Sequence, residues 1–271
     1  LKSLRKQEEK EREYQKNLLE EVKKAEAANR AKTEFLQRMS HDIRTPINGI
    51  SGMLDVAEHY SDDLQKQAEC RQKIREASDI LFELVSEVLD MSKLESGEIQ
   101  LEEKPFDVVT LLDEVTGVVG RLADERNITV AHKGRTIEHR NLIGSPVHLK
   151  RLLMNIMSNA VKYNRDHGHI YLYTRELPSA DSSIATLQFV CEDNGIGMSE
   201  EFQQRIFEPF TQEQKGGASK FGGTGLGMSI AKSLAEKMGG TISFESTQGV
   251  GTTFIITIPF KIDTQVGSHT P

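Results

Sequence analysis

The sequence predicts an α + α/β protein in which a long helical N-terminal part precedes a separate α/β domain. Residues 1–31 contain no glycine or proline and are rich in Glu, Lys, Arg, Gln and Ala, which favour one uninterrupted helix. From Leu36 to about Leu94, apolar residues recur at alternating spacings of three and four, which is typical of packed amphipathic helices. After Pro105 come short apolar helices, β-rich runs such as Ile170–Tyr173 and many more glycines.

Length and composition indicate two compact parts and exclude some classes of partner. The 271 residues are 37% hydrophobic, which is enough for a substantial core. The net charge is -7, the pI is about 5.7 and no basic block is present. A broad surface for nucleic acid or anionic membrane is therefore not expected, and any bound anion must be held by a local site.

The cysteines and the chain start bear on the compartment. Cys70 and Cys191 are far apart, and neither has a second cysteine at metal-ligand spacing, which fits a reducing compartment. No run approaches the length of a membrane-spanning helix, and Leu1 opens into charged residues instead of a signal peptide. We therefore expect a cytoplasmic piece of a longer protein, with any membrane segment outside this sequence.

The first 30 residues are expected to form a signalling coiled coil. Continuing the heptad register back from Leu36 and Met39 places apolar residues at about half of the seam positions, among them Leu18 and Val22. A charged single helix is the alternative. A weak two-stranded coiled coil is favoured because its register runs unbroken into the next helix, and such an element can change register at small cost.

The chain is organised around the stretch Ser40–Pro46, which carries His41, Asp42 and Thr45. The expected helix seam consists of Leu36, Met39, Ile43, Pro46, Ile50, Met53 and Ala57. His41 lies off this seam and is expected to face solvent, with Thr45 beside it one turn on. Pro46 should disturb the helix just after them. Taken alone, the pattern also fits an ordinary exposed histidine.

A second helix from about Leu64 to Leu94 completes a predicted hairpin. Residues 59–63 supply the turn and a helix cap, and Gly97 ends the second helix. Its seam consists of Ile74, Ala77, Leu81, Leu84, Val88 and Met91. The apolar stripe exceeds what one hairpin can bury, so we predict a homodimer in which two hairpins form a four-helix bundle.

A later helix begins at Ser145-Pro146 and carries two asparagines in its middle. Its inward face is expected to contain Leu149, Leu152, Leu153, Ile156 and Ala160. Asn155, Asn159 and Lys162 share another face, next to Tyr163. Asparagines in mid-helix need partners for their amides. An amide oxygen suits Mg²⁺ and a lysine suits phosphate, but a solvated polar stripe explains the pattern equally well.

Two glycine-containing motifs follow. Asp193–Met198 comes directly after the apolar strand 187–190, where a carboxylate can hold a purine amino group and glycines admit a close ligand. Residues 222–228 open a helix at Ser229, an arrangement that cradles phosphates with backbone N–H groups. The polar segment 199–222 between them is expected to close over nucleotide. The last strand, 252–258, follows Gly249–Gly251.

These motifs, in this order, resemble the H, N, G1, F, G2 and G3 boxes of bacterial sensor histidine kinases. The segments that carry the resemblance are 41–46, 155–163, 193–198, 207–210, 223–227 and 249–254. The resemblance covers roughly residues 30–262, and the stretches 91–97 and 105–107 resemble the branch that includes many hybrid kinases. Any one box is weak evidence, so the resemblance rests on all six boxes occurring in the family's order.

The resemblance implies the following organisation. The signalling coiled coil is 1–30, the dimerising hairpin with the phosphotransfer histidine is 31–97, and a linker occupies 98–104. An ATP-binding α/β sandwich, shared with gyrase, mismatch-repair and heat-shock-chaperone ATPases, occupies 105–262, and 263–271 is a tail. The parent protein is expected to be anchored in the bacterial inner membrane.

The resemblance also implies residue roles. His41 would be the phosphoacceptor, Asp42 the acid that orients or deprotonates its ring, and Thr45 a helper that places water in a phosphatase reaction. Asn159 would ligate Mg²⁺ and Asp193 would hold the adenine amino group. The implied ATP contacts are Asn155, Asn159, Lys162, Tyr163, Asp193, Gly195, Gly197, Gly223, Thr224, Gly225, Leu226, Gly227 and Thr252. Three positions depart from the family pattern: Ser145, Asn164 and Met228.

Three functions compete at this point. The first is an ATP-dependent histidine autokinase that passes its phosphoryl group to an aspartate of a response regulator. The second is an ATPase that only opens and closes a dimer, and the third is a coiled-coil adaptor with an inactive pocket. An exposed His41 beside Asp42 favours the first, because the other two need no acceptor histidine.

Overall fold

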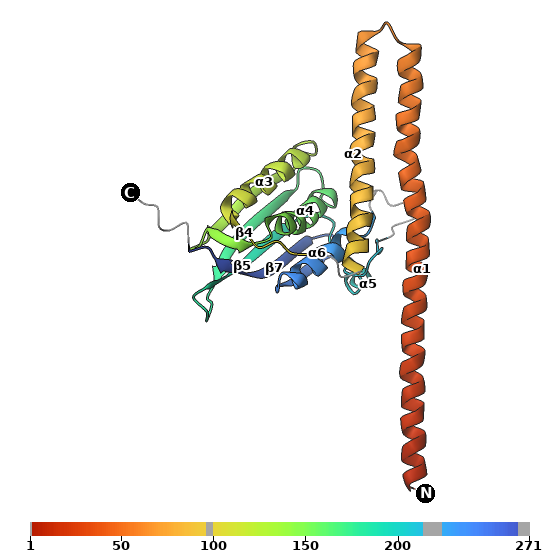
Figure 1. Cartoon of the computed structure of the whole chain (residues 1–271), viewed down its shortest axis with the longest axis vertical. Helices are drawn as coiled ribbons and strands as arrows, with labels where there is room; N and C mark the ends of the chain where they lie inside the picture. Colours follow the sequence, from red (N-terminus) through yellow and green to blue (C-terminus); the bar gives the residue numbers. More distant parts are fainter. Residues whose placement is uncertain (1, 96–99, 214–223, 265–271) are drawn as a thin grey trace. The chain divides into compact units, whose positions relative to one another are not determined.

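The computed structural model describes residues 2–95, 100–213 and 224–264. The chain divides into two compact units, Leu1–Ser86 and Glu87–Pro271. Figure 1 shows the long helices of the first unit and the mixed sheet of the second. Among the described helices, none combines the length and the apolar character that crossing a membrane requires.

The first unit is the predicted helical hairpin. Helix α1 spans Lys2–His59 and continues on both sides of Pro46, and α2 spans Leu64–Glu95. The Asp63 carboxylate accepts hydrogen bonds from the N–H groups of Gln65 and Lys66, both at 3.0 Å, and so caps α2 as predicted. The cap fixes where α2 begins and therefore its register against α1. Gly97, the expected end of the second helix, lies outside the described residues.

The apolar seam predicted for α1 is buried or half-buried at all but one of its positions. Met39 and Pro46 are buried, as is Cys70 of α2, and the half-buried seam residues are Ile43, Ile50, Met53 and Ala57. Leu36, placed in the same seam by its spacing, is 57% exposed, so the seam prediction was wrong at that position. Ile47 and Leu54, outside the seam, are 44% and 50% exposed, so a single hairpin leaves apolar side chains uncovered, as the sequence predicts.

The second unit is a seven-stranded sheet covered on one face by helices, which confirms the predicted α/β sandwich. Its strands are β1 (Lys104–Asp107), β2 (Thr129–Thr136), β3 (Asn141–Gly144), β4 (His169–Leu177), β5 (Ile184–Asp193), β6 (Thr241–Thr247) and β7 (Gly251–Ile262). Its helices are α3 (Val108–Asp124), α4 (Pro146–Lys162), α5 (Glu200–Gln203) and α6 (Gly227–Lys237). The strand order is β1-β3-β7-β5-β4-β2, with β6 also paired to β7. Among the strand pairs of the described residues, only β2–β4 is parallel.

Burial alternates along the central strands, so one face of the sheet is covered and the other is half-exposed. In β5, Leu187 and Phe189 are buried, while Gln188 and Val190, which alternate with them, are half-buried. Helix α4 lies between α3 and α6 and turns its apolar face to the sheet. The five residues predicted to face inward, Leu149, Leu152, Leu153, Ile156 and Ala160, are all buried.

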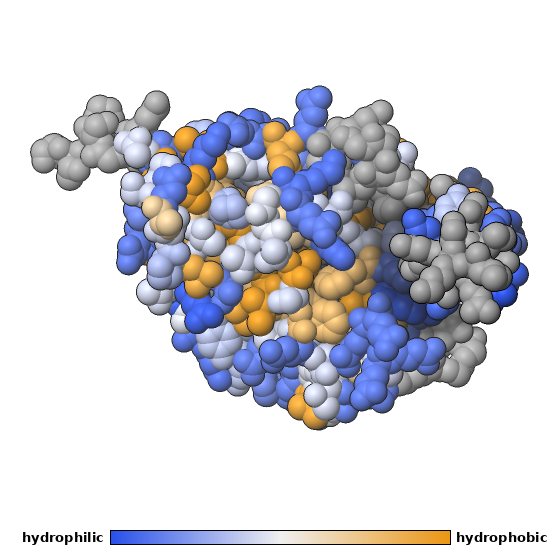
Figure 2. Space-filling view, turned by 90° about the horizontal axis from the view of Figure 1, so that it is seen from below, coloured by the Kyte–Doolittle hydropathy of each residue, from blue (hydrophilic) through white to orange (hydrophobic). Residues whose placement is uncertain are grey.

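The surface is mixed in polarity. The space-filling view in Figure 2 shows apolar side chains gathered in the middle of one face, with hydrophilic side chains around them. Apolar atoms contribute more than half of the surface of an ordinary folded protein. This gathering therefore assigns no binding site by itself, and the candidate site has to be found from specific polar contacts.

Candidate functional site

His41 lies in solvent on α1, as its position off the seam predicts. Its side chain is 78% exposed, and its Nδ1 atom is 3.2 Å from Oδ1 of Asp42. The Thr45 hydroxyl donates to the His41 carbonyl oxygen at 3.1 Å. The acid therefore holds one ring nitrogen, which leaves Nε2 as the outward-facing nitrogen, while Thr45 is held by the backbone and not by the ring.

The two mid-helix asparagines of α4 point at the start of α6. Asn155 donates through Nδ2 to the Gly227 carbonyl oxygen at 3.1 Å, and Asn159 donates through Nδ2 to Sδ of Met228 at 3.2 Å. These contacts are the amide partners that mid-helix asparagines require. Helix α6 begins at Gly227, two residues before the predicted start. Asn155 and Asn159 therefore contact the first two residues of the helix.

Asp193 is the last residue of β5 and is largely buried. Its Oδ1 atom accepts the N–H of Gly195 at 2.8 Å. Burial raises the pKa of Asp193 to about 6, the nearby Glu192 charge adds to this, and the N–H groups of Gly195 and Thr252 oppose it. A buried carboxylate that retains only two backbone donors is well suited to receive a further donor from a ligand.

The loop after Asp193 lies directly against the end of α4. The Ile196 N–H donates to the Tyr163 carbonyl oxygen at 3.0 Å. A side chain at position 195 would place its Cβ 2.4 Å from the same oxygen, so only glycine fits there. Gly197 has a φ of 59°, and a Cβ on it would lie 2.0 Å from the Thr247 carbonyl oxygen. Both glycines are fixed by close backbone approach.

The start of α6 closes the site on its third side. Thr224 is buried and its Oγ1 atom accepts the Leu226 N–H at 3.1 Å, while the Phe210 N–H donates to the Gly225 carbonyl oxygen at 3.1 Å. The Thr252 hydroxyl lies 2.9 Å from that of Ser246. Gly223 and most of the segment expected to close over nucleotide lie outside the described residues.

The described residues of the predicted nucleotide site thus meet where α4 ends, β5 ends and α6 begins. Asn155 and Asn159 contact α6, and the Tyr163 carbonyl group contacts the loop of Gly195 and Gly197. Lys162 is half-buried, with Nζ 5.1 Å from the centre of the Tyr163 ring. His41, Asp42 and Thr45 belong to the other unit and form a separate group.

Sequence reasoning missed the polar residues that support this site from outside its motifs. Arg165 donates through Nη2 to the carbonyl oxygens of Gly195 and Gly249, at 2.9 and 2.8 Å. Arg126 donates to the end of α4. Both are charged residues in polar turns, where a sequence pattern does not distinguish a supporting residue from a solvated one.

The three departures from the family pattern have local partners. Ser145 is the N-cap residue of α4, where the helix was predicted to begin, but its hydroxyl pairs with Nδ1 of His148 at 2.6 Å and not with a backbone N–H. Asn164 is 1% exposed and bonds to the Arg165 N–H and the His169 carbonyl oxygen. Met228 is the sulfur partner of Asn159.

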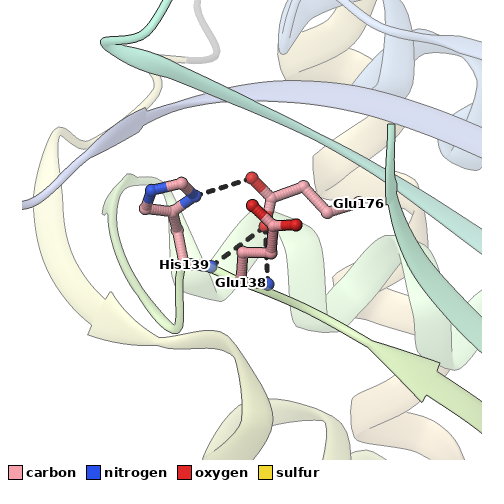
Figure 3. A group of neighbouring side chains, drawn as sticks. All are labelled: Glu138, His139 and Glu176. Atoms are coloured by element: carbon pink, nitrogen blue, oxygen red, sulfur yellow. Dashed lines mark hydrogen bonds and ion pairs between the residues drawn. The ribbon is translucent and has the colours of Figure 1, made fainter. Parts of the chain in front are cut away.

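Glu138, His139 and Glu176 form a separate group whose ligand-type atoms lie within 4.8 Å of one another (Figure 3). Glu176 accepts the N–H groups of Glu138 and His139 on one oxygen and His139 Nδ1 at 2.7 Å on the other. Burial opposes ionisation of Glu176, but these hydrogen bonds outweigh it and lower its pKa. The group therefore anchors the turn between β2 and β3 to β4 by hydrogen bonds.

Two family models match the chain. The model described as "His Kinase A (phospho-acceptor) domain" matches residues 31–97. The model described as "Histidine kinase-, DNA gyrase B-, and HSP90-like ATPase" matches residues 144–262. The first range contains the His41 group, and the second contains every residue of the predicted nucleotide site.

Curated proteins and a solved structure agree with these models. The chain is 36% identical over 249 residues to the sensory/regulatory protein RpfC of Xanthomonas campestris pv. campestris, covering 92% of this chain and 34% of that protein. It is 35% identical over 241 residues to hybrid signal transduction histidine kinase B of Dictyostelium discoideum, covering 89% of this chain and 12% of that protein. Full-length ShkA in complex with AMPPNP matches with a TM-score of 0.62 and 28% identity, covering 85% of this chain and 46% of that chain.

The chain spans about a third or less of the length of these curated relatives. Within that span, the order of an acceptor helix and an ATPase-like sandwich is the same in the family models and in the fold. The chain belongs to the sensor histidine kinase family.

Proposed function

We propose that this chain is the kinase core of a two-component signalling protein. It transfers the γ-phosphoryl group of ATP to His41 and passes it on to an aspartate of a response-regulator receiver domain. The observation that carries the proposal is His41 itself, a 78% exposed histidine with Asp42 on one ring nitrogen. An ATPase that only opens and closes a dimer has no use for this arrangement.

The geometry around His41 suits attack on phosphorus. With Nδ1 protonated and donating to Asp42, the Nε2 lone pair faces solvent and can form the N–P bond while the bond between the γ-phosphorus and the ADP oxygen breaks. Positive charge then develops on the ring, and the adjacent carboxylate stabilises it. Asp42 thus fixes which nitrogen reacts and offsets the charge that the reaction creates.

The second unit would bind ATP where α4, β5 and α6 meet. Asp193 would accept the adenine amino group, and the glycines 195 and 197 would admit the ring between backbone segments. Asn155, Lys162, Thr224, the backbone around Leu226 and Thr252 would contact ribose and phosphates, together with Gly223. ShkA, which was solved with an ATP analogue, supports this assignment by its likeness to this chain.

Mg²⁺ fits the donor set of this site. Asn159 uses its Nδ2 atom on Met228, so its amide oxygen, a neutral hard ligand, is the atom left to bind a cation. The ion would neutralise charge on the transferring phosphoryl group. Lys162 would add a positive charge on the same side of α4.

The partner of the hairpin is a second copy of the chain. Ile47 and Leu54 on α1, and Phe82, Val85 and Leu89 on α2, are between 42% and 76% exposed. They recur at spacings of three, four and seven, so each helix presents a second apolar stripe. Two hairpins that bury these stripes against each other form a four-helix bundle. Leu18 and Val22, exposed at 48% and 45%, would continue the pairing as a coiled coil.

Catalysis would then depend on bringing the ATP site of one unit to the histidine of the other. A coiled coil that changes its register could bias that movement and so transmit a signal. Thr45 would place water when the same core removes phosphate from its regulator. Anchoring of the parent protein in a bacterial inner membrane stays a prediction.

The test is incubation with γ-labelled ATP and Mg²⁺, comparing the wild-type chain with His41→Gln and with the control His59→Gln. His59 is also exposed and lies on the same helix. Label that is acid-labile, base-stable, lost in His41→Gln and kept in His59→Gln supports the kinase. Equal labelling of both variants would overturn the acceptor assignment, and ATP hydrolysis with no labelled protein would support the ATPase alternative.

A further inference from the structure

Arg126 donates hydrogen bonds to the C-terminal end of α4 from the neighbouring turn. It follows α3, in the turn that leads to β2. Its Nη1 atom donates to the carbonyl oxygens of Val161 and Lys162, at 2.8 and 3.2 Å, and its Nη2 atom donates to that of Asn164 at 2.7 Å. Its Nε atom donates to Asp166 at 2.9 Å.

The contacts to Val161 and Lys162 meet a physical need of the helix end, since α4 ends at Lys162. The last carbonyl groups of an α-helix have no partner within the helix, and a positive charge there is favourable because of the helix dipole. The guanidinium group is planar and presents several donors at once, so it can satisfy three carbonyl groups together. The Arg126 side chain is 29% exposed, which limits the competition from water.

The backbone of the same turn adds a further connection. The His167 N–H donates to the Arg126 carbonyl oxygen at 3.2 Å, and the Thr129 N–H donates to the Gly168 carbonyl oxygen at 2.9 Å. The turn between α3 and β2 is therefore bonded to the turn between α4 and β4 through both side chain and backbone. The segment 161–168 has little freedom to move while Arg126 is in place.

That segment carries the nucleotide site. Lys162 and Tyr163 are two of its residues, and the Tyr163 carbonyl group is the partner of Ile196 in the loop that follows Asp193. The same oxygen lies where a side chain of Gly195 would be. A shift at the end of α4 would therefore move Lys162 on the phosphate side and the Asp193 loop on the adenine side together.

We propose that Arg126 is a positioning residue for the nucleotide site, acting through the end of α4. It touches neither nucleotide nor reacting atoms in this role; it fixes where Lys162 and the Tyr163 carbonyl group lie. The inference rests on the proposed function of this site as an ATP site. A purely stabilising role makes a different prediction, because a folded variant would then bind nucleotide as tightly as the wild type.

The experiment measures the affinity of the full chain for ADP by calorimetry, at a temperature where circular dichroism shows every variant folded. The variants are Arg126→Gln, Arg126→Lys and the control Arg175→Gln, since Arg175 is an exposed arginine of β4 with one side-chain partner, Gln188. We expect Arg126→Gln to weaken ADP binding about tenfold or more and Arg126→Lys to recover only part of it, because a point charge cannot replace the planar donor set. Arg175→Gln should bind as the wild type does.

A double-mutant cycle adds a readout that stability alone would not change. If Arg126 acts through Lys162, the loss caused by Arg126→Gln should be smaller in a Lys162→Ala background than in the wild type. ADP affinity within twofold of the wild type in folded Arg126→Gln would overturn the inference. Equal losses in both backgrounds would overturn the action through Lys162 and support action through the Tyr163 carbonyl group and the Asp193 loop alone. If Arg126→Gln does not fold, Arg126→Lys decides by the same two criteria.

The same data separate this inference from the proposed function. Binding is measured with ADP and needs no transfer to His41. A wild-type chain that binds ADP but never labels His41 would contradict the kinase proposal while leaving the positioning role to be decided by the variants. A wild-type chain that binds no ADP would contradict both.

Discussion

Replacing Asp193 by asparagine should stabilise the nucleotide-free protein and weaken its affinity for ATP. Burial raises the pKa of Asp193 from its ordinary value of 3.8 to about 6. One pKa unit corresponds to about 1.4 kcal/mol, so the ionised carboxylate costs the fold about 3 kcal/mol at neutral pH. Asparagine keeps an oxygen for the Gly195 N–H without that charge.

The sign of the pH dependence follows from the direction of the shift. The pKa of Asp193 is higher in the folded protein than in the unfolded chain, so between pH 4 and 6 the folded state binds more protons. Its contribution to the free energy of unfolding therefore falls as pH rises through this window and is constant above it. ATP binding runs the other way, because the adenine amino group donates to the ionised form and affinity should rise through pH 6.

The assay is urea unfolding followed by circular dichroism at pH 4.5, 6, 7 and 8, for the wild-type chain, Asp193→Asn and the control Glu245→Gln. Glu245 is an exposed carboxyl in β6. Differences between wild type and variant remove the contributions of other titrating groups. We expect the variant to gain about 2 kcal/mol at pH 7 relative to pH 4.5, since part of the shift already acts at pH 4.5, and to bind ATP about 10- to 100-fold more weakly. A variant less stable than the wild type at pH 7, or a difference that does not change with pH, would refute the reasoning.

Three further predictions concern the glycine loop, the dimer and the phosphatase reaction. Gly197→Ala puts a side chain at a φ of 59° and 2.0 Å from the Thr247 carbonyl oxygen, so we expect a loss of about 1–3 kcal/mol in urea unfolding, and an unchanged midpoint would contradict the clash. Ile47→Asp should convert the dimer to monomer in analytical ultracentrifugation while the neighbouring change Asn48→Asp does not; a dimeric Ile47→Asp would place the interface elsewhere. Thr45→Ala removes a bond to the His41 carbonyl oxygen. Autophosphorylation should therefore stay within about threefold of the wild type, while dephosphorylation of the regulator falls by about tenfold or more. Equal losses of both activities would count against a water-placing role.

The parts of the fold that could be predicted are those in which pattern and packing agree. The hairpin, the cap at Asp63 and the inward face of α4 follow from spacing and capping chemistry, because each depends on residues close in sequence. The order of the strands could not be read from the residues in the same way. β6 and β3 both pair with β7, whereas β2 pairs with β4 in parallel, and such partners are set by contacts between distant segments.

The residues of the candidate site also divide into those that could be predicted from the sequence and those that could not. The motif residues could be named because their order along the chain resembles the boxes of sensor histidine kinases. Mid-helix asparagines and a glycine pair after a strand break local preferences, but alone they fit a polar stripe and a turn equally well. The supporting residues could not be named, since Arg126 and Arg165 are ordinary charged residues in polar turns. They support the site through hydrogen bonds to particular carbonyl groups, which the sequence does not reveal. Leu36 was misplaced for a related reason, because spacing alone does not say which seam positions a single hairpin covers.

The His41 group and the nucleotide site also differ in how they affect the free energy of unfolding. Inactivating substitutions at the two places should therefore differ in their effect on stability. His41 is an exposed helical residue, and within the part of the chain that the structure describes its side chain pairs only with Asp42. Its replacement should therefore leave stability almost unchanged. The nucleotide site holds a buried carboxylate, two mid-helix asparagines and Phe210 at a φ of 67°, each of which opposes folding unless something offsets it. A ligand that binds only the folded state supplies that offset by mass action. Inactivating changes in the ATP site should therefore often stabilise the nucleotide-free protein, whereas inactivating changes at His41 should not, and a set of stability measurements on inactive variants would separate the two groups without any assay of phosphoryl transfer.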